Sequence, residues 1–342
     1  MQAALVTGKG RVELLEVPEP RPEAGKAVVE VAYCGVCGTD VHAYQSGQPY
    51  NPAICGHEWM GTVVAVGAGV TEVREGDRVV GGVSPACGRC PQCRAGNAAA
   101  CAYGMVSITG GPGGRPHGGF ARRIAAMSDQ LTPVPAGLSD VEAALVEPLT
   151  VALHAVRRTR IRLGDTVAVL GAGPIGLLTL QCAKAAGGGR VIVVEPDAGR
   201  AALARKVGAD AVLNPRADDV AGALLAATGG LGPEVVFECA GISPTINQAV
   251  ELVRRGGNVT MVGLSSDDAV ISPRTWLAKE VTFVTSMAYL HEEFVIAMEL
   301  IAARRIDVAS LHTATYGLEE AQAAFEALAT EKTQVKVLIR PS

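Results

Sequence analysis

The chain has 342 residues, of which 49% are hydrophobic and 19% are charged, and its formal net charge is −4. This composition excludes a disordered protein, and the length suits two domains rather than one core. The small acidic balance offers no electrostatic footprint for nucleic acid, and the sequence has no apolar run long enough to span a bilayer.

The first part of the chain, up to about residue 145, is predicted to be β-rich. Short β-type runs, cut by Gly and Pro, occur at residues 3–6, 27–33, 61–66, 77–81 and 119–125. The N-terminus reads as a strand and not as a charged-then-apolar leader, so a cytoplasmic location is expected. The nine cysteines agree with this location, because an odd number with four clustered fits metal binding in a reducing compartment.

Two segments of this β-rich part offer ligands for a reactive metal. They are Cys37-Gly-Thr-Asp-Val-His42 and Gly56-His-Glu58. A thiolate and an imidazole suit a zinc site, and a catalytic zinc also needs a third protein ligand and a vacant position. A carboxylate is the expected third ligand, and Glu58 and Glu147 are both candidates. Spacing alone does not distinguish such a site from ordinary packing or surface residues.

Four cysteines at short spacings predict a second, structural zinc site. Cys87, Cys90, Cys93 and Cys101 follow one another at separations of three, three and eight residues. Four thiolates leave no open coordination position, so such a site stabilises the fold and the chemistry must lie elsewhere. An iron–sulfur cluster is the alternative, but the bacterial ferredoxin run places its last cysteine after three residues and follows it with proline. In this chain the gap between Cys93 and Cys101 is longer.

From about residue 146 the pattern changes to strands that alternate with Ala- and Leu-rich helical segments. The five expected strands are residues 167–170, 191–195, 211–213, 235–239 and 258–263, and this alternation predicts a doubly wound parallel sheet with crossover helices. Beyond Glu280 come a β-type run, a helix over 292–303 and a strand over 335–339. These elements suggest that the chain returns to the first domain.

A glycine-rich turn in the second part predicts a dinucleotide site. The strand at 167–170 runs into Gly171-Ala-Gly173-Pro174-Ile175-Gly176 and then into a helix at 177–186. Gly171 permits the tight turn, Gly173 lets the backbone approach a pyrophosphate, and Gly176 lets helix and strand pack closely. Glu195 ends the next strand, where a carboxylate binds the adenosine ribose and repels a 2′-phosphate, so NAD is favoured over NADP. Arg200 either stacks on adenine or is a solvated helix residue.

These motifs, in this order and at these separations, resemble the zinc-containing medium-chain dehydrogenases over essentially the whole chain. Cys37 to His42 and Glu147-Pro-Leu-Thr-Val-Ala-Leu-His154 look like the sorbitol, 2,3-butanediol and L-threonine dehydrogenase branch. The resemblance implies an α/β fold with a GroES-like β-rich catalytic domain (1–148), a Rossmann NAD-binding domain (149–284) and a return segment (285–342), with the active-site cleft between the domains. It also implies two zinc ions per chain, NAD, and a homo-oligomer, either a tetramer or a dimer.

The resemblance assigns roles to the reactive segments. It implies Cys37 and His57 as zinc ligands, with Glu58 and Glu147 binding the ion directly or through water, and it leaves open which of the two binds directly. It implies Thr39 and His42 as a proton relay, in which His42 exchanges the proton with solvent. Asp40 would orient His57 or another ligand through a hydrogen bond. The residues expected near the nicotinamide ribose and ring are Cys239, Val262, Gly263, Leu264, Ser286 and Met287.

The expected reaction is hydride transfer between a secondary alcohol (a polyol, a vicinal diol or a cyclic alcohol) and NAD, with the ketone as product. Sorbitol dehydrogenases generally carry an Arg-Tyr pair where this chain reads Ser286-Met-Ala-Tyr-Leu-His291, which argues against sorbitol itself. Tyr289 and His291 either contact substrate or serve packing. L-Threonine is the alternative substrate, although threonine dehydrogenases usually have aspartate in place of Glu147. Two further alternatives are a non-catalytic NAD-binding sensor and a zinc-ribbon module, and the latter lacks a basic face.

Overall fold

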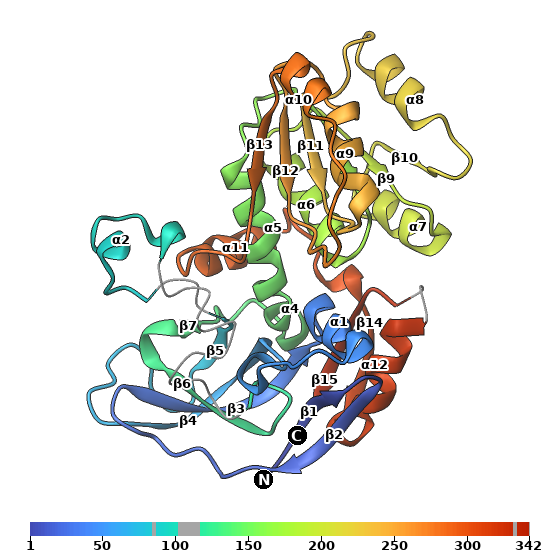
Figure 1. Ribbon diagram of the computed structural model, residues 1–342. Coiled ribbons are helices and arrows are strands. Elements are labelled where there is room, and N and C mark those ends of the chain that lie inside the picture. The colour runs from blue at the N-terminus through green and yellow to red at the C-terminus, as the bar shows by residue number, and fades with distance from the viewer. Residues whose placement is uncertain (84–86, 102–116, 331–333, 342) are drawn as a thin grey trace. The chain divides into compact units, whose positions relative to one another are not determined.

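Two units, each with its own sheet, make up the chain (Figure 1). The structure is a computed structural model that describes residues 1–83, 87–101, 117–330 and 334–341. Unit 1 comprises Met1–Thr150, Ala288–Ala302 and His312–Ser342, and unit 2 comprises Val151–Met287 and Ala303–Leu311. The chain therefore leaves unit 1 and comes back to it. The domain boundaries expected from the sequence stay a prediction.

Unit 1 is built around a mixed seven-stranded sheet. Its strand order is β14-β15-β3-β4-β5-β7, and β6 also pairs with β3. β14 and β15 are parallel and the other pairs are antiparallel. β1 and β2 pair in a separate, two-stranded antiparallel sheet. The strands of unit 1 are β1 (Gln2–Gly8), β2 (Arg11–Glu16), β3 (Lys26–Gly35), β4 (Glu58–Val66), β5 (Arg78–Gly81), β6 (Arg123–Met127), β7 (Thr132–Pro133), β14 (His312–Gly317) and β15 (Lys336–Arg340).

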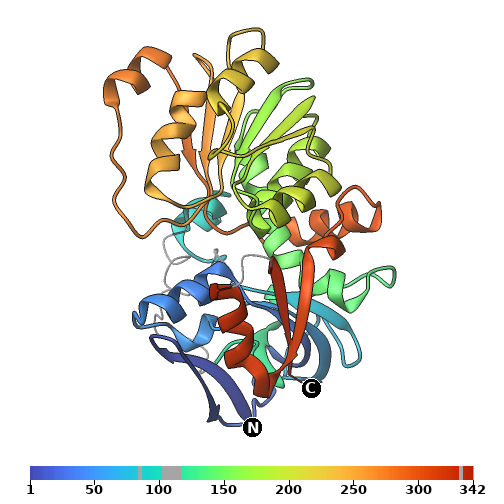
Figure 2. The ribbon, with the colours of Figure 1, turned by 90° about the vertical axis from the view of Figure 1, so that its right-hand side faces the viewer.

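The core of unit 1 lies between this sheet and a helix from the end of the chain. Trp59, Phe120 and Phe325 are at most 2% exposed, and the rings of Phe120 and Phe325 meet edge to face at 5.8 Å. Phe325 belongs to α12, which lies beside β14 and β15 (Figure 2). The helices that begin in unit 1 are α1 (Gly38–Ser46), α2 (Pro91–Arg94), α4 (Asp140–Ala144), α5 (Val146–Arg158), α11 (Glu293–Ala302) and α12 (Ala321–Thr330), with 3₁₀ turns at Pro52–Ile54, Ala98–Ala100, Ser128–Gln130 and Leu318–Glu320.

The segment after Cys37 forms the helix α1, which the β-rich reading of this part did not anticipate. Asp40 lies in its first turn, and its Oδ2 accepts a hydrogen bond from the Cys37 backbone N–H at 2.9 Å. Gly47 ends the helix with a φ of 71°, a conformation that glycine adopts without strain. The Asp40 side chain and Gly47 set the two ends of this nine-residue helix, and packing on β1 and α12 stabilises it.

Unit 2 contains a six-stranded parallel sheet with the order β10-β9-β8-β11-β12-β13. This is the doubly wound Rossmann order, and it confirms the fold class predicted from the sequence. The run after Glu280 forms the sixth strand of this sheet, so it belongs to unit 2 and is not part of the return to the first domain to which the sequence analysis assigned it. The strands are β8 (Thr166–Leu170), β9 (Arg190–Val194), β10 (Ala211–Leu213), β11 (Val235–Glu238), β12 (Asn258–Met261) and β13 (Thr282–Thr285).

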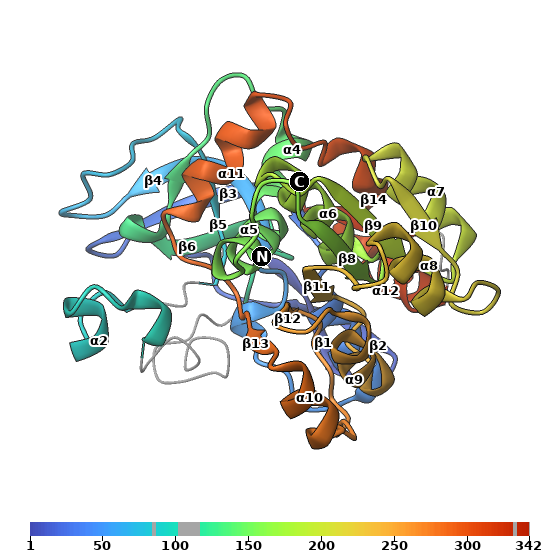
Figure 3. The same ribbon diagram turned by 90° about the horizontal axis from the view of Figure 1, so that it is seen from above.

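Helices cover both faces of the unit 2 sheet, which Figure 3 shows from above. Ala168 and Leu170 of β8 belong to one apolar cluster with Val250 of α9. Because side chains alternate along a strand, Val167 and Val169 point to the opposite face, where α6 packs on β8 and β9. The helices of unit 2 are α6 (Pro174–Ala185), α7 (Ala198–Lys206), α8 (Val220–Ala227), α9 (Ser243–Leu252) and α10 (Pro273–Lys279), with a 3₁₀ turn at Ala309–Leu311.

Candidate active site

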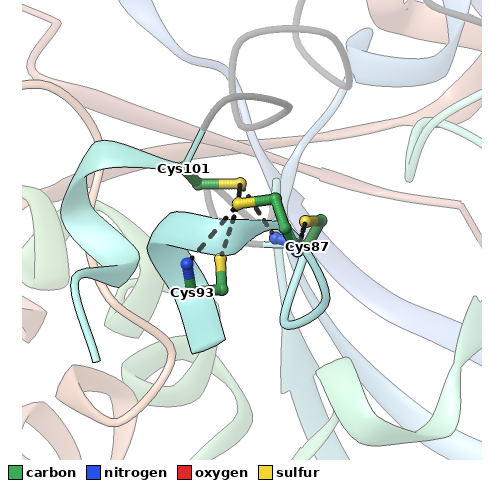
Figure 4. Close-up of side chains that lie close together, drawn as sticks. Cys87, Cys93 and Cys101 are labelled. Carbon is green, nitrogen blue, oxygen red and sulfur yellow. Dashed lines mark hydrogen bonds between the residues drawn. The ribbon is translucent and has the colours of Figure 1, made fainter. Parts of the chain in front are cut away.

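The four clustered cysteines of unit 1 converge in space (Figure 4). Cys90 Sγ lies 3.5 Å from Cys93 Sγ and 4.0 Å from Cys101 Sγ. Backbone N–H groups also point at the sulfur atoms, since Cys87 N–H donates to Cys101 Sγ at 3.2 Å and Cys90 N–H donates to Cys87 Sγ at 3.3 Å. A tetrahedral zinc with Zn–S bonds of about 2.3 Å places its sulfur atoms about 3.8 Å apart. The cysteine cluster therefore fits a structural zinc ion.

A second cluster gathers one thiol, one imidazole and one carboxylate. Cys37 directly precedes α1, His57 directly precedes β4, and Glu58 is the first residue of β4. Their potential ligand atoms all lie within 4.8 Å of one another. His57 and Glu58 are 9% and 2% exposed. Sulfur, nitrogen and oxygen donors are the set that zinc accepts in catalytic sites, so this donor set also fits the ion.

The imidazole of His57 has its orientation fixed by the backbone. Its Nδ1 lies 2.8 Å from the carbonyl oxygen of Ile54, which can only accept a hydrogen bond, so Nδ1 carries the proton and Nε2 is left for a metal. Burial lowers the pKa of His57, but the charge of the Cys37 thiolate and of the nearby carboxylates outweighs this and raises the pKa well above its usual value. The cluster thus attracts positive charge.

Asp40 ties the two ligand-bearing segments together. Its fully buried carboxylate accepts hydrogen bonds from the Cys37 N–H at 2.9 Å, the Tyr50 hydroxyl at 2.7 Å and the Gly56 N–H at 3.4 Å. Burial raises the pKa of Asp40, and the charge of His57 and these hydrogen bonds oppose the rise. The sequence analysis expected Asp40 to orient His57 or another ligand. In the structure the hydrogen bond goes to the backbone of Cys37, while Ile54 holds His57.

Glu58 forms a buried ion pair that the sequence analysis missed. Lys336 Nζ lies 2.8 Å and 2.6 Å from the two carboxylate oxygens of Glu58, and the side chains of Lys336 and Glu58 are 2% and 3% exposed. The sequence feature that could have revealed this pair is Lys336 itself, a charged residue inside the apolar run 335–339. Such a position in a buried strand is rarely charged.

Glu147, at the start of α5, lies close to the same cluster. Burial raises the pKa of Glu147, the charge of His57 opposes the rise and the charge of Glu58 adds to it, and the resulting pKa is about 7. The buried hydroxyl of Tyr289 makes no hydrogen bond of standard geometry among the described residues, yet it is near enough to Glu147 for the two groups to shift each other's pKa. Gly82 leaves room for both groups, because a Cβ there would lie 2.3 Å from the Tyr289 hydroxyl and 2.8 Å from Glu147 Cγ.

Thr39 and His42, the expected proton relay, lie on α1. Thr39 Oγ1 is 3.5 Å from Cys37 Sγ, and His42 is exposed to solvent. They are three residues apart on one helix, so they share a face. His291, the other residue considered for substrate contact, is 3.5 Å from the Thr132 hydroxyl, and burial lowers its pKa.

The glycine-rich turn follows β8 in unit 2 and has the shape of a phosphate cradle. Gly171 has a φ of +95°, and a Cβ on Gly176 would lie 1.9 Å from the Gly171 carbonyl oxygen, so both positions need glycine. Gly173 differs, because among the described residues beyond its immediate chain neighbours no atom lies within 4 Å of the Cβ that it lacks. This open space at the N-terminus of α6, beside Pro174 and Ile175, fits an approaching pyrophosphate.

Glu195 follows β9 and anchors the same turn. Its carboxylate accepts hydrogen bonds from the Ala172 N–H at 2.7 Å and the Asp197 N–H at 2.8 Å, and it is 5% exposed. Each carboxylate oxygen keeps a second lone pair for a ribose hydroxyl. Arg200 lies in the first turn of α7, where its backbone N–H donates to Asp197 Oδ1.

The other residues expected at the cofactor follow β11, β12 and β13. In a parallel sheet these carboxyl ends share one edge with the glycine turn after β8 and with Glu195 after β9. Ser286 Oγ is buried without a hydrogen-bond partner among the described residues, so it can hydrogen-bond to a polar group of a ligand or to a water molecule. Leu264 and Met287 are 57% and 55% exposed. The expected residues on this edge are Cys239, Val262, Gly263, Leu264, Ser286 and Met287.

Glu238, which the sequence analysis did not single out, organises this edge. Its Oε1 accepts hydrogen bonds from the N–H groups of Ala240 and Gly241 and from the Thr245 hydroxyl, and so fixes the turn after β11. The sequence feature that could have pointed to Glu238 is its position as an acidic residue at the end of an apolar strand.

Two family models match this chain. The alcohol dehydrogenase GroES-like domain matches residues 23–136, and the zinc-binding dehydrogenase domain matches residues 174–303. A sorbitol dehydrogenase of Halalkalibacterium halodurans is 34% identical over 338 residues, which cover 98% of this chain and 97% of that protein. The chain belongs to the zinc-containing medium-chain dehydrogenases.

Solved structures agree with this zinc dehydrogenase family. The 2R,3R-butanediol dehydrogenase from Bacillus subtilis has a TM-score of 0.88 and 32% identity, with 100% of this chain and 99% of that chain covered. A zinc-binding dehydrogenase from Sinorhizobium meliloti 1021 bound to NADP has a TM-score of 0.88 and 33% identity, with 99% of each chain covered. The medium-chain dehydrogenase described here is therefore an alcohol dehydrogenase of the polyol branch that uses zinc and a nicotinamide cofactor.

In this medium-chain dehydrogenase, no helix among the residues outside the gaps is long and apolar enough to cross a membrane.

Proposed function

We propose that this dehydrogenase oxidises a secondary alcohol (a polyol, a vicinal diol or a cyclic alcohol) to the ketone with NAD as hydride acceptor. The observation that carries the proposal is the convergence of the Cys37, His57 and Glu58 ligand atoms within 4.8 Å of one another. A zinc ion held there supplies Lewis acidity, which lowers the pKa of an alcohol hydroxyl. Such a cluster suits the removal of a proton and a hydride from one CH–OH group.

The ligand set is part of this proposal. Cys37 supplies a thiolate and His57 supplies Nε2, because its Nδ1 donates to Ile54. Glu58 and Glu147 complete the set directly or through water. Glu58 keeps Lys336 as its partner in the described structure, whereas Glu147 faces the Tyr289 hydroxyl, so the two carboxylates have different surroundings at the same cluster.

Thr39 and His42 supply the proton path. The Thr39 hydroxyl lies beside Cys37 Sγ, where it can accept a proton from a substrate hydroxyl. His42 is exposed, so its imidazole can exchange that proton with solvent. The glycine-rich turn of unit 2 would hold the nicotinamide cofactor, which would supply the hydride acceptor.

The preference for NAD rests on Glu195. Its buried carboxylate is tied to the glycine turn and to the start of α7, so it cannot swing away from a 2′-phosphate without breaking two hydrogen bonds. The substrate class is suggested by the relatives, which are named sorbitol and butanediol dehydrogenases. Sorbitol itself is disfavoured because the arginine of the Arg-Tyr pair is missing.

A substrate panel tests this function. The purified protein is incubated with NAD and, in turn, vicinal diols, sugar alcohols, cyclic alcohols and L-threonine, and NADH is followed at each alcohol with and without a zinc chelator. Chelator-sensitive NADH formation with one alcohol class is the expected result. Cys37→Ser is the matched variant: it should lose turnover and one zinc per chain but still bind NAD. Turnover of L-threonine alone would move the substrate to the amino-alcohol class, and normal turnover by Cys37→Ser would refute the metal assignment.

We also propose that the chain forms a homo-oligomer, a tetramer or a dimer, and that it works in the cytoplasm. The location is supported by the thiolate metal sites, since thiols stay reduced there.

A further inference from the structure

Lys336 is a charged residue whose side chain is almost completely shielded from solvent. Lys336 is the first residue of β15 and is 2% exposed. Its ammonium donates to both carboxylate oxygens of Glu58, at 2.8 Å and 2.6 Å, and to the carbonyl oxygen of Val36 at 3.2 Å. A buried ammonium is stable only with such a set of acceptors. Lys336 and Glu58 therefore depend on each other.

Glu58 has little freedom to leave this arrangement. Gly35 lies opposite Glu58 in the pairing of β3 and β4. A Cβ at Gly35 would lie 2.2 Å from Glu58 Oε2, so the carboxylate rests directly on the glycine backbone. One side of Glu58 thus contacts β3, another contacts Lys336, and an oxygen lies within 4.8 Å of the ligand atoms of Cys37 and His57.

We propose that Lys336 is a positioning residue that shares the carboxylate of Glu58 with the reactive zinc and so keeps this zinc weakly held. The proposal rests on the proposed function, because it requires zinc at Cys37 and His57. An ammonium that donates to both oxygens withdraws negative charge from the carboxylate, which makes it a poorer metal ligand. Glu58 can still reach the ion through the second lone pair of an oxygen. Lys336 therefore sets how strongly Glu58 binds the metal.

The proposed role of Lys336 can be distinguished from simple packing, because only the proposed role acts through the charge of the ion pair. If Lys336 only fills the core, its replacement changes stability but leaves zinc release unchanged. If it acts through Glu58, removal of the positive charge leaves a buried carboxylate whose remaining cation is the zinc, and the zinc is held more tightly. The two roles therefore predict different rates of zinc release.

The test measures zinc release from the purified protein into an excess of a colorimetric chelator. The variants are Lys336→Met, Lys336→Gln and, as the matched control that keeps the charge, Lys336→Arg. We expect Lys336→Met and Lys336→Gln to release the reactive zinc at least tenfold more slowly than the wild type, and Lys336→Arg to stay within threefold of it. The zinc of Cys87, Cys90, Cys93 and Cys101 is an internal reference whose release rate stays constant.

A second set of variants tests whether Lys336 slows or speeds zinc release through Glu58. In Glu58→Gln the carboxylate is gone, so the addition of Lys336→Met should no longer slow zinc release. Added zinc should also raise the Tm of zinc-stripped Lys336→Met by more than that of zinc-stripped wild type, because a tighter ligand stabilises the folded state more. Lys336→Gln decides the matter if Lys336→Met does not fold.

Three outcomes overturn specific parts of the argument. Release of the reactive zinc by both uncharged variants at the wild-type rate or faster refutes the role of Lys336. Slowing that persists in the Glu58→Gln background refutes the action through Glu58. A wild-type protein that holds only one zinc per chain, with the same content in Cys37→Ser, refutes the proposed function instead, and so the two failures are distinguished.

Discussion

At the scale of single residues, the reactive cluster gives each buried carboxylate a different partner. Asp40 accepts hydrogen bonds from the Cys37 backbone and Tyr50, Glu58 pairs with Lys336, and Glu147 faces the Tyr289 hydroxyl. Burial of a carboxylate is costly unless charge or hydrogen bonds compensate it. Asp40 thus links the segments that carry Cys37 and His57, whereas the proposed zinc ion would help to compensate the charges of Glu58 and Glu147.

The residue-scale prediction concerns the choice of cofactor. Glu195→Ala removes the negative charge that opposes a 2′-phosphate, and the ratio of kcat/KM for NAD to kcat/KM for NADP should fall at least about tenfold. Glu195→Gln removes the charge but keeps an acceptor for the Ala172 or Asp197 N–H, so the ratio should fall in this variant too if the charge selects the cofactor. Steady-state kinetics with both cofactors measure the ratio. An unchanged ratio in both variants would show that Glu195 does not select the cofactor.

At the scale of elements, a single side chain joins α6, β9 and β10. Asp210 directly precedes β10, and its Oδ2 accepts from the Val191 N–H at 2.7 Å and from Lys184 Nζ at 3.0 Å. Burial raises the pKa of Asp210, but the Val191 N–H and Lys184 outweigh burial and the pKa is lowered overall. The charged form of Asp210 therefore stabilises this corner of unit 2.

The element-scale prediction follows from the sign of that shift. Asp210→Asn should lower the free energy of unfolding by about 0.5 kcal/mol at pH 7, a small value because the side chain is 37% exposed and solvent screens its ion pair. The stabilising contribution is complete above the unfolded-state pKa and disappears as the pH falls through the lowered folded-state pKa. Urea titrations across this acidic range should show the wild type and the variant converging. A difference that grows as the pH falls would contradict the assignment.

The parts of the fold and site that could be predicted are those whose signals are close together in the sequence. The four cysteines lie on one short loop, and the glycine turn lies between its own strand and helix, so local spacing is enough to recognise both. The pair of Lys336 and Glu58 joins residues 278 positions apart, and only the pairing of β15 with β3 and of β3 with β4 brings them together. No periodicity in the sequence encodes such a contact.

At the scale of the whole molecule, the edge strand β13 of the unit 2 sheet is preceded in the chain by a segment with exposed apolar side chains. β13 is the last strand in the order and pairs with β12, so its other edge offers backbone N–H and C=O groups to a further strand. Leu277 of α10 and Val270 just before it are 80% and 88% exposed. An edge of this kind with exposed apolar neighbours suits a two-fold contact with a second copy of the chain.

The whole-molecule prediction is that this edge forms an interface of the proposed oligomer. Leu277→Asp combined with Val270→Asp should lower the molar mass measured by light scattering, because buried charges oppose association. Leu231→Asp is the matched control, since Leu231 is 68% exposed in the loop between α8 and β11. The same mass for the double variant and the wild type would place the interface elsewhere.

The return of the chain to unit 1 has a consequence for synthesis on the ribosome. The cysteine loop at residues 87–101 is made early, and it contains all four clustered sulfur atoms and the backbone N–H groups of Cys87 and Cys90 that donate to them. The reactive cluster includes Tyr289 and Lys336, which are translated after the whole of unit 2 apart from its short last segment. Because chains emerge and fold from the N-terminus, a nascent chain can take up its structural zinc long before it can complete the surroundings of the reactive one. The order of synthesis therefore allows the structural zinc to bind before the reactive one, and a chain that ends before residue 289 keeps the four clustered cysteines but lacks Tyr289 and Lys336.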